Sequence, residues 1–496
     1  MSDNVIELKN ISKSFYGVQV LKDIDMHLKA GEALCIAGEN GSGKSTIIKI
    51  ISGVHVYDNG ELTINGNVYK TITPSQSMNE GIQVIYQDFS LFPNLSVAEN
   101  IGLSDHLQKK KSGFSIKLCK ETAQKSLEKI GVAMDLDMLV EDLSVAQKQI
   151  VAIARAIMQD AKVIIMDEPT TTLTQREIER LYEIINSLKE SGVAVIFVSH
   201  KLDEIFAVCD RIFVIRNGET VADYPVDEFQ QDMLAYYMTG SHITEERYIP
   251  ESVSDDYIFE VRNLAYKNYF RKISFGVKKG EILCLTGRLG SGRLELAKAL
   301  FGALPVTDGE IFLKGKKITV DSITEAIGNS IAYIPEDRLS EGLFLDAIIR
   351  NNLSAVVLKR LTKKFGLLRE KDKEKLSNEW IDKLSIKARS EDAAHTLSGG
   401  NQQRVVLAKW MASNPELFIL NCPTMGVDVK SKFEIHTIIK KMAKEGVAVL
   451  MVSDDVGEIL YNSNRVLVIN EGEITFEADT QSLTYESLSD KIKEGV

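Results

Sequence analysis

The stretch that decides the fold reads Ala33-Leu34-Cys35-Ile36-Ala37-Gly38-Glu39-Asn40-Gly41-Ser42-Gly43-Lys44-Ser45. It starts as a short apolar run typical of a buried strand, turns through glycines, and opens a helical pattern over residues 45–52. A strand, a glycine-rich turn and a helix in this order are the context in which G-x-x-x-x-G-K-[ST] is specific. The sequence therefore predicts a phosphate-binding loop at residues 38–45.

The residue types in this loop suit a nucleotide with Mg²⁺. Glycines let backbone N–H groups close around phosphates at the start of a helix. Lys44 then neutralises the β- and γ-phosphate charge, and Ser45 offers a hydroxyl ligand to the metal. The predicted nucleotide contacts in this stretch are Gly38, Glu39, Asn40, Gly41, Ser42, Gly43, Lys44, Ser45 and Thr46.

Polar side chains at the ends of two later apolar runs complete the prediction. Asp167 and Glu168 follow residues 163–166, where Asp167 is the expected Mg²⁺ partner and Glu168 the base that orients water. His200 ends the run 193–198 and is expected near the γ-phosphate. Gln87 is a weaker candidate for a catalytic and metal-binding role, and either Phe15 or its neighbour Tyr16 could stack on adenine, unless Phe15 is a core residue.

The sequence contains two copies of the same series of motifs. Residues 29–38 (KAGEALCIAG) match residues 278–287 (KKGEILCLTG), and further motifs recur in the same order. In each copy, β-rich runs alternate with helical patterns, which predicts an α/β fold with a mainly parallel sheet. A mostly helical insert precedes residues 143 and 397, and each copy ends in a strand-turn-strand pattern. The expected division is a first domain at 1–240, a linker at 241–256 and a second domain at 257–496.

The second copy has lost the residues that would perform chemistry. Arg293 stands in place of the loop lysine and Leu294 in place of the metal-binding hydroxyl. Asn421 and Cys422 occupy the positions of the two carboxylates, and Asp454 that of the histidine. Glu336 replaces the glutamine. We therefore expect no hydrolysis by this copy alone.

The first copy is altered elsewhere. Its segment Leu143-Ser144-Val145-Ala146-Gln147 corresponds to Leu397-Ser398-Gly399-Gly400-Asn401 in the second copy, so side chains stand where glycine backbone could approach a phosphate. Thr174 likewise stands where the second copy has Asp428. Gly399 and Gly400, read alone, would only be a loop before a helix at 402–411.

Composition limits the classes of function. A balance of 59 basic and 70 acidic residues, with net charge −11, is not the basic footprint of a nucleic-acid-binding protein. The five cysteines have no C-x-x-C spacing, which fits a reducing compartment. The sequence predicts neither a signal peptide nor a run of about 18 to 20 apolar residues that could span a bilayer.

With these motifs in order, twice, nearly the whole chain resembles ABC-type ATPases. It resembles more closely the fused double-ATPase subunits of bacterial sugar importers of the ribose, galactose and xylose type. The finer shared features are the second loop with Arg293, the stretch Pro335-Glu336-Asp337-Arg338, and the sequence LSGGNQQ at 397–403. Asn421-Cys422 departs from the common pattern of that family.

The resemblance implies two tandem P-loop ATPase domains, each with a parallel core, an antiparallel β subdomain and a helical subdomain. It also implies that each nucleotide lies between the phosphate-binding loop of one domain and the signature of the other. The signature is the segment at 143–147 in the first copy and at 397–401 in the second. The intact residues then share one site: Ser398, Gly399, Gly400 and Asp428 complete the site of Lys44 and Glu168, with ATP and Mg²⁺ as cofactors. The altered residues share the other site.

The implied partners are two membrane permease subunits and a periplasmic or extracellular solute-binding protein. The expected location is peripheral, on the cytoplasmic face of the inner membrane, without insertion and without nucleic acid. The solute is expected to be a monosaccharide or a related small polar compound, and a nucleoside stays open. The alternatives are a soluble tandem ATPase acting on ribosomes or nucleic acid and a nucleotide sensor without catalysis.

Overall fold

The apolar run before the glycine-rich loop forms β3 (Ala33–Ala37), whose five residues are all buried. The structure is a computed structural model. It describes the whole chain except residues 1–3, 40, 87–88, 109–114, 171–172, 174, 200, 241–246, 250–255, 289, 363–367 and 495–496, and the side chains of residues 104–108, 175–176, 203, 231–232 and 494. The chain divides into two units, Met1–Ile243 and Thr244–Val496.

The first unit is built on a six-stranded sheet in the order β10-β9-β3-β8-β7-β6. Its other strands are β6 (Ile82–Ile85), β7 (Val163–Asp167), β8 (Ala194–Val198), β9 (Arg211–Arg216) and β10 (Glu219–Pro225). All neighbours pair in parallel except β9 and β10, which form an antiparallel hairpin. Because parallel strands are covered on both faces, they are continuous apolar runs, and their carboxyl ends share one edge.

A second, antiparallel sheet in this unit has the order β2-β1-β4-β5. Its strands are β1 (Asn4–Phe15), β2 (Val18–Lys29), β4 (Asn59–Ile64) and β5 (Asn67–Tyr69). Apolar residues of β1, β2 and β4 form one core cluster with those of α1 (Lys44–Ile51) and with the central strands. This packing fixes the helix that follows the glycine-rich loop.

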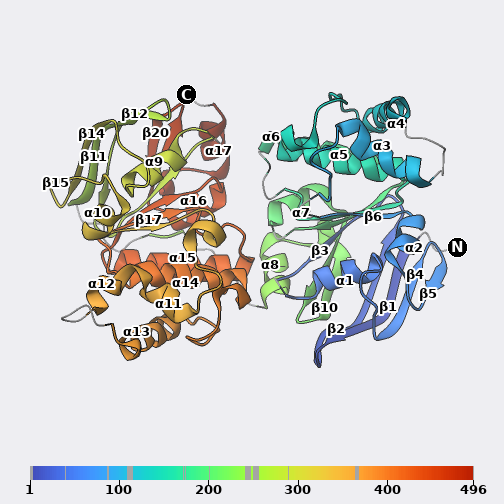
Figure 1. Cartoon of the computed structure of the whole chain (residues 1–496), viewed down its shortest axis with the longest axis horizontal. Coiled ribbons are helices and arrows are strands. Elements are labelled where there is room, and N and C mark those ends of the chain that lie inside the picture. The colour runs from blue at the N-terminus through green and yellow to red at the C-terminus, as the bar shows by residue number, and fades with distance from the viewer. Residues whose placement is uncertain are drawn as a thin grey trace. The chain divides into compact units, whose positions relative to one another are not determined.

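The insert before residue 143 is helical, as the sequence predicts. It contains α3 (Val97–Gln108) and α4 (Ile116–Lys129), which lie together with α5 (Val145–Met158) in Figure 1. Three successive lysines in this insert, at residues 109–111, lie outside the described residues. The remaining helices are α2 (Pro74–Asn79), α6 (Gln175–Glu190), α7 (Leu202–Val208) and α8 (Gln231–Thr239).

The second unit repeats this topology strand for strand. Its main sheet has the order β16-β17-β18-β13-β19-β20, which is the order of the first unit read from the other edge, and its antiparallel sheet is β12-β11-β14-β15. The strands are β11 (Tyr257–Tyr266), β12 (Phe270–Lys278), β13 (Ile282–Thr286), β14 (Asp308–Leu313), β15 (Lys316–Ile318), β16 (Ile331–Ile334), β17 (Leu417–Asn421), β18 (Ala448–Val452), β19 (Arg465–Asn470) and β20 (Glu473–Asp479). The predicted duplication of an α/β fold is confirmed.

The helices of the second unit follow the same plan. They are α9 (Arg293–Leu300), α10 (Ile323–Gly328), α11 (Ile349–Ser354), α12 (Leu358–Leu361), α13 (Glu370–Lys383), α14 (Gly399–Met411), α15 (Val429–Lys444), α16 (Val456–Asn462) and α17 (Tyr485–Glu494). At α14 the structure differs from the loop that Gly399 and Gly400 would suggest when read alone. The helix includes both residues in its first turn, although glycine has a low helix propensity.

Part of the segment predicted as linker packs on the second unit. Tyr248 is buried, and its N–H donates to Tyr461 O at 3.0 Å. Arg247 donates from Nη2 to Leu483 O at 3.0 Å. In the described part of the chain, no helix is both long and apolar enough to cross a membrane.

Candidate functional site

The glycine-rich loop of the first unit is enclosed by its neighbours. A Cβ at Gly38, where φ is 151°, would overlap the carbonyl oxygen of Ile215 in β9. At Gly43, where φ is 116°, it would lie 2.6 Å from Leu21 Cδ2. The hairpin turn also holds the loop, since Gly218 N donates to Ser42 O at 3.1 Å. The conformation and the close packing at Gly38 and Gly43 therefore require glycine.

Lys44 lies at the start of α1, which has no side-chain cap. Its ammonium donates to the carbonyls of Gly38 at 2.8 Å and Glu39 at 2.9 Å. The side chain therefore curls over the loop and keeps its charge beside the uncapped N–H groups. Ser45 is exposed and Thr46 is partly exposed, so both can meet a ligand. Asn40 lies outside the described residues.

Asp167 and Glu168 stand at the carboxyl end of β7. Burial raises the pKa of Asp167, the neighbouring Glu168 charge raises it further, and Lys44 and Lys49 oppose this. Glu168 has φ of 49°, a left-handed backbone that is rare outside glycine, and its N–H donates to Val198 O at 2.9 Å. Two adjacent carboxylates facing a lysine form a set that a divalent cation would stabilise.

Other predicted residues are less constrained. Phe15 is partly buried; the centre of its ring lies 5.1 Å from the centre of the His55 ring, and Lys13 Nζ lies 5.2 Å from the Phe15 ring centre. Tyr16, the competing stacker, is fully exposed. Both remain candidates for the adenine platform. Gln87, His200 and Thr174 lie outside the described residues, so their roles stay predictions.

The second unit keeps the loop but not its chemistry. Gly287 has the same φ of 151°, and a Cβ there would overlap Ile469 O, the counterpart of Ile215 O. Gly472 N donates to Ser291 O at 3.0 Å, as Gly218 does in the first unit. Arg293, however, is 4% exposed, and its Nε and Nη1 are buried without a hydrogen-bond partner among the described residues.

The guanidinium of Arg293 is 3.4 Å from Asp454, at the position that corresponds to the histidine. This ion pair joins the two positions that should flank a γ-phosphate. Asn421 is fully buried and donates from Nδ2 to Tyr333 Oη at 3.2 Å. Burial raises the pKa of the Cys422 thiol, and the negative charges of Asp454 and Glu336 raise it further. A neutral thiol and a buried amide cannot replace the carboxylate pair.

The two signature segments differ in how they use their serine. Ser144 caps α5: its Oγ accepts from Gln147 N at 3.3 Å, while Gln147 Oε1 accepts from Ser144 N at 2.9 Å. This reciprocal pair is a capping box. At the matching start of α14, Ser398 makes no such cap, and its Oγ accepts instead from Asn401 Nδ2 at 3.0 Å. The start of α14 is therefore left uncapped by its own serine.

The signature glycines have a packing reason that the sequence did not reveal. A Cβ at Gly400 would overlap the hydroxyl of Ser431, and one at Gly399 would lie 2.8 Å from Arg338 Nη2. Ser431 is fixed in turn by Asp428, whose carboxylate accepts from Ser431 N and Oγ, both at 2.9 Å. The start of α14 therefore packs tightly on the segment after β17.

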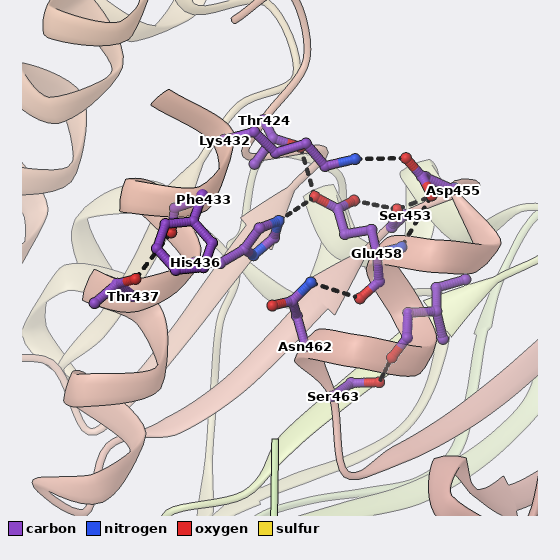
Figure 2. Close-up of polar contacts among 11 residues, drawn as sticks. Thr424, Lys432, Phe433, His436, Thr437, Ser453, Asp455, Glu458, Asn462 and Ser463 are labelled. Carbon is purple, nitrogen blue, oxygen red and sulfur yellow. Dashed lines mark hydrogen bonds and ion pairs between the residues drawn. The ribbon is translucent and has the colours of Figure 1, made fainter. Parts of the chain in front are cut away.

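Figure 2 shows a buried polar network beside this segment, centred on Glu458 of α16. Its carboxylate accepts from Thr424 Oγ1 at 2.5 Å and from Ser453, and it lies 2.8 Å from His436 Nε2 of α15. The first unit has a counterpart in Glu204, which accepts from Thr170 at 2.6 Å and Ser199 at 2.8 Å. In the sequence, the matching threonine, serine and glutamate of the two copies are the signal that could have revealed this network.

Comparisons with known proteins agree with this geometry. The family model described as ABC transporter matches residues 21–171 and again residues 270–425. The Ribose import ATP-binding protein RbsA of a Bacillus cereus strain is 43% identical, over 97% of this chain and 98% of that protein. Proteins of the same name from Bacillus subtilis and Clostridium tetani are each 40% identical over 97% of this chain, and the match covers 98% and 96% of them. The chain therefore belongs to the ABC transporter family and carries its ATP-binding region twice.

Proposed function

We propose that this chain is the ATP-hydrolysing subunit of an ABC importer for a monosaccharide, with one catalytic and one degenerate nucleotide site. The relatives, which are named for ribose import and match over almost their full length, support a sugar of that class. The active site pairs the first loop with the signature of the second copy. The observation that carries this pairing is a difference between the two signature serines: the side chain of Ser144 caps its own helix, and that of Ser398 does not.

The residues of the first unit divide the work. The loop at 38–45 and Lys44 bind the phosphates through backbone N–H groups and one ammonium, and Phe15 or Tyr16 supports the base. Glu168 orients and polarises the attacking water, and Gln87 and His200 position the γ-phosphate. The uncapped start of α14, at Ser398, Gly399 and Gly400, supplies the opposing N–H groups. Hydrolysis then rests on positioning and charge stabilisation.

Ser45 and Asp167 are the residues that would hold Mg²⁺, with Gln87 as a further ligand. Bound there, the metal neutralises charge on the β- and γ-phosphates. The donor set fits because Asp167 and Glu168 are adjacent carboxylates, Asp167 is close enough to Lys44 for its charge to act on it, and the next residue, Ser45, has an exposed hydroxyl. In the second copy, Leu294, Asn421 and Cys422 offer no strong ligand for a hard cation, so that site holds at most nucleotide.

The proposed partners are two membrane permeases and, through them, an external solute-binding protein, with this chain peripheral on the cytoplasmic face of the membrane. An exposed aromatic at the same place in each unit supports docking. Phe92 is 54% exposed and Phe344 64%, although their backbones are fixed. Asn100 Oδ1 accepts from Phe92 N at 2.8 Å, and Asn352 Oδ1 accepts from Phe344 N at 2.9 Å.

The experiment that tests the function compares Glu168→Gln with Cys422→Ser, at the matching position of the second copy. Glu168→Gln should lower ATP hydrolysis at least about 100-fold, because it removes the base, while ATP binding persists. Cys422→Ser should leave the rate unchanged. Turnover is measured as phosphate release and binding by equilibrium dialysis. Full activity of Glu168→Gln would refute the assignment, and an inactive wild-type chain in the assembled transporter would refute ATP hydrolysis itself.

A further inference from the structure

Arg338 connects three segments of the second unit that are far apart in sequence. It follows β16 and begins a single turn of π-helix, Arg338–Gly342. Its Nη1 donates to Met425 O at 2.8 Å and its Nη2 to Gly426 O at 3.1 Å, both in the loop after β17. Its Nε lies 3.4 Å from Gln402 Oε1 in the first turns of α14. One guanidinium therefore joins the loop after β16, the loop after β17 and the signature helix.

The glycines around this guanidinium leave room for it. A Cβ at Gly399 would lie 2.8 Å from Arg338 Nη2, and a Cβ at Gly426 would lie 3.3 Å from Nη1. Gly426 also has φ of 65°, which turns its carbonyl and that of Met425 toward the arginine. A planar fork with parallel N–H groups can hold two successive carbonyls, and a lysine ammonium cannot hold them in the same geometry.

The corresponding position of the first unit carries a different contact. Phe89 corresponds to Arg338, and it contributes a carbonyl, which accepts from Arg155 Nη2 at 3.1 Å. Arg155 lies near the end of α5, far along that helix from Ser144. At this pair of matching positions, the second copy therefore places an arginine at the start of its signature helix, and the first copy does not. The second copy is also the one whose signature serine, Ser398, does not cap its helix.

We propose that Arg338 is a positioning residue for the signature at 398–400. It holds the first turn of α14 against the segment 424–428, so that the signature and this segment move together with the loop that begins at Pro335. This inference rests on the proposed function, in which that signature completes the catalytic site. It assigns to Arg338 no contact with nucleotide.

The test uses the complete transporter with Arg338→Met, which keeps an unbranched apolar stem and removes the guanidinium. The kcat for ATP hydrolysis should fall about tenfold, because a signature displaced by part of an ångström stabilises the transition state less. The KM for ATP and its dissociation constant should stay within about twofold, since the first loop is untouched. Arg338→Lys should recover only part of the loss.

Arg360→Met is the matched control, because Arg360 donates from Nη2 to Ala412 O at 2.7 Å at the opposite end of the same helix. It should leave kcat unchanged. Hydrogen exchange of the isolated chain supplies a readout independent of turnover: Arg338→Met should raise exchange at 398–401 and 425–428, and Arg360→Met should not. Unchanged exchange in Arg338→Met, or an equal fall in kcat for both variants, would overturn the proposal. If the wild-type chain hydrolyses no ATP but the exchange difference appears, Arg338 still positions the signature and the proposed function fails.

Discussion

At the scale of single residues, the second copy has lost reactive groups and kept backbone geometry. Cys422 has φ of 48°, almost that of Glu168, and its N–H donates to Val452 O at 3.0 Å as Glu168 N does to Val198 O. A left-handed, non-glycine backbone is costly, so the surrounding fold enforces it. The strained turn is therefore a property of the fold, and the two copies differ in the side chain that this turn carries.

The exposed phenylalanines allow a prediction about partner binding. Phe92→Ser and Phe344→Ser should each weaken stimulation of ATP hydrolysis by the permeases, because an exposed aromatic at an interface contributes a large share of the binding energy. The basal rate of the isolated chain should not change. The measurement compares hydrolysis with and without permeases in lipid vesicles.

A suitable control for that experiment is Val68→Ser, which removes an apolar side chain that is 58% exposed on β5. If Val68→Ser reduces stimulation as much as the two phenylalanine variants, these aromatics are not the docking points. A loss of basal hydrolysis in Phe344→Ser would instead indicate damage to the fold.

Individual residues also show what the sequence could predict. The loop at 38–45, the carboxylates after β7 and their replacements at 421–422 follow from short motifs whose neighbours lie adjacent in the chain. Arg338 could be noticed but not interpreted, because its partners Met425 and Gly426 are distant in sequence. The capping difference between Ser144 and Ser398 depends on side-chain rotamers, which sequence spacing does not determine.

At the scale of elements, the Glu458 network ties α15 and α16 to the loop after β17. Burial alone would raise the pKa of Glu458, but the contacts with His436 and the hydrogen bond from Ser453 outweigh it and lower the pKa. The stabilisation is therefore present above the unfolded pKa of about 4.3 and is lost as the pH falls toward the folded value. The first unit differs at the matching positions: Tyr182 stands at the position of His436, and Lys201 is 3.1 Å from Glu204.

The network around Glu458 predicts that substitutions of His436 lower the stability of the second unit, which can be followed separately from the first within the whole chain. His436→Phe removes the imidazole that lies 2.8 Å from the buried carboxylate of Glu458 and should cost the second unit about 3 kcal/mol, because a buried polar group then lacks a partner. His436→Tyr, which restores the residue of the first copy, should recover part of the loss because a phenol can donate to Glu458. Both tryptophans, Trp380 and Trp410, lie in the second unit, so urea unfolding followed by tryptophan fluorescence reports on it.

Tyr182→Phe is the corresponding change in the first unit and should leave the tryptophan transition where it is. A transition of His436→Phe that coincides with that of the wild-type chain would show that the contact between His436 and Glu458 contributes nothing to stability. Equal losses in His436→Phe and His436→Tyr would show that the imidazole is needed for its shape rather than as a donor.

At the scale of the whole molecule, the two copies have one topology and opposite losses. The first copy keeps the loop lysine, the hydroxyl and the carboxylates, and its signature serine caps its own helix. The second keeps an uncapped signature start, and its loop arginine is turned toward Asp454. The repeat predicted two copies of a mainly parallel α/β fold, but it did not predict the order of the strands in each sheet. How the two copies work together concerns the pair, and the residue pattern of either copy alone cannot supply it.

The pairing predicts that two substitutions in different copies have the same effect. Ser398→Arg places a bulky cation at the start of α14, where the proposed site needs bare N–H groups, so it should reduce ATP hydrolysis as severely as Lys44→Ala. Lys44→Ala should also weaken ATP binding, because it removes a phosphate contact, whereas Ser398→Arg should leave ATP binding to the loop at 38–45 nearly unchanged.

Ser144→Arg is the matched control, since it alters the same position of the degenerate pair and loses only a helix cap, at a cost of about 1 kcal/mol. Phosphate release by the three variants in the assembled transporter decides the matter: if Ser144→Arg is the more harmful signature change, the catalytic loop is served by the other signature and the assignment of sites must be reversed.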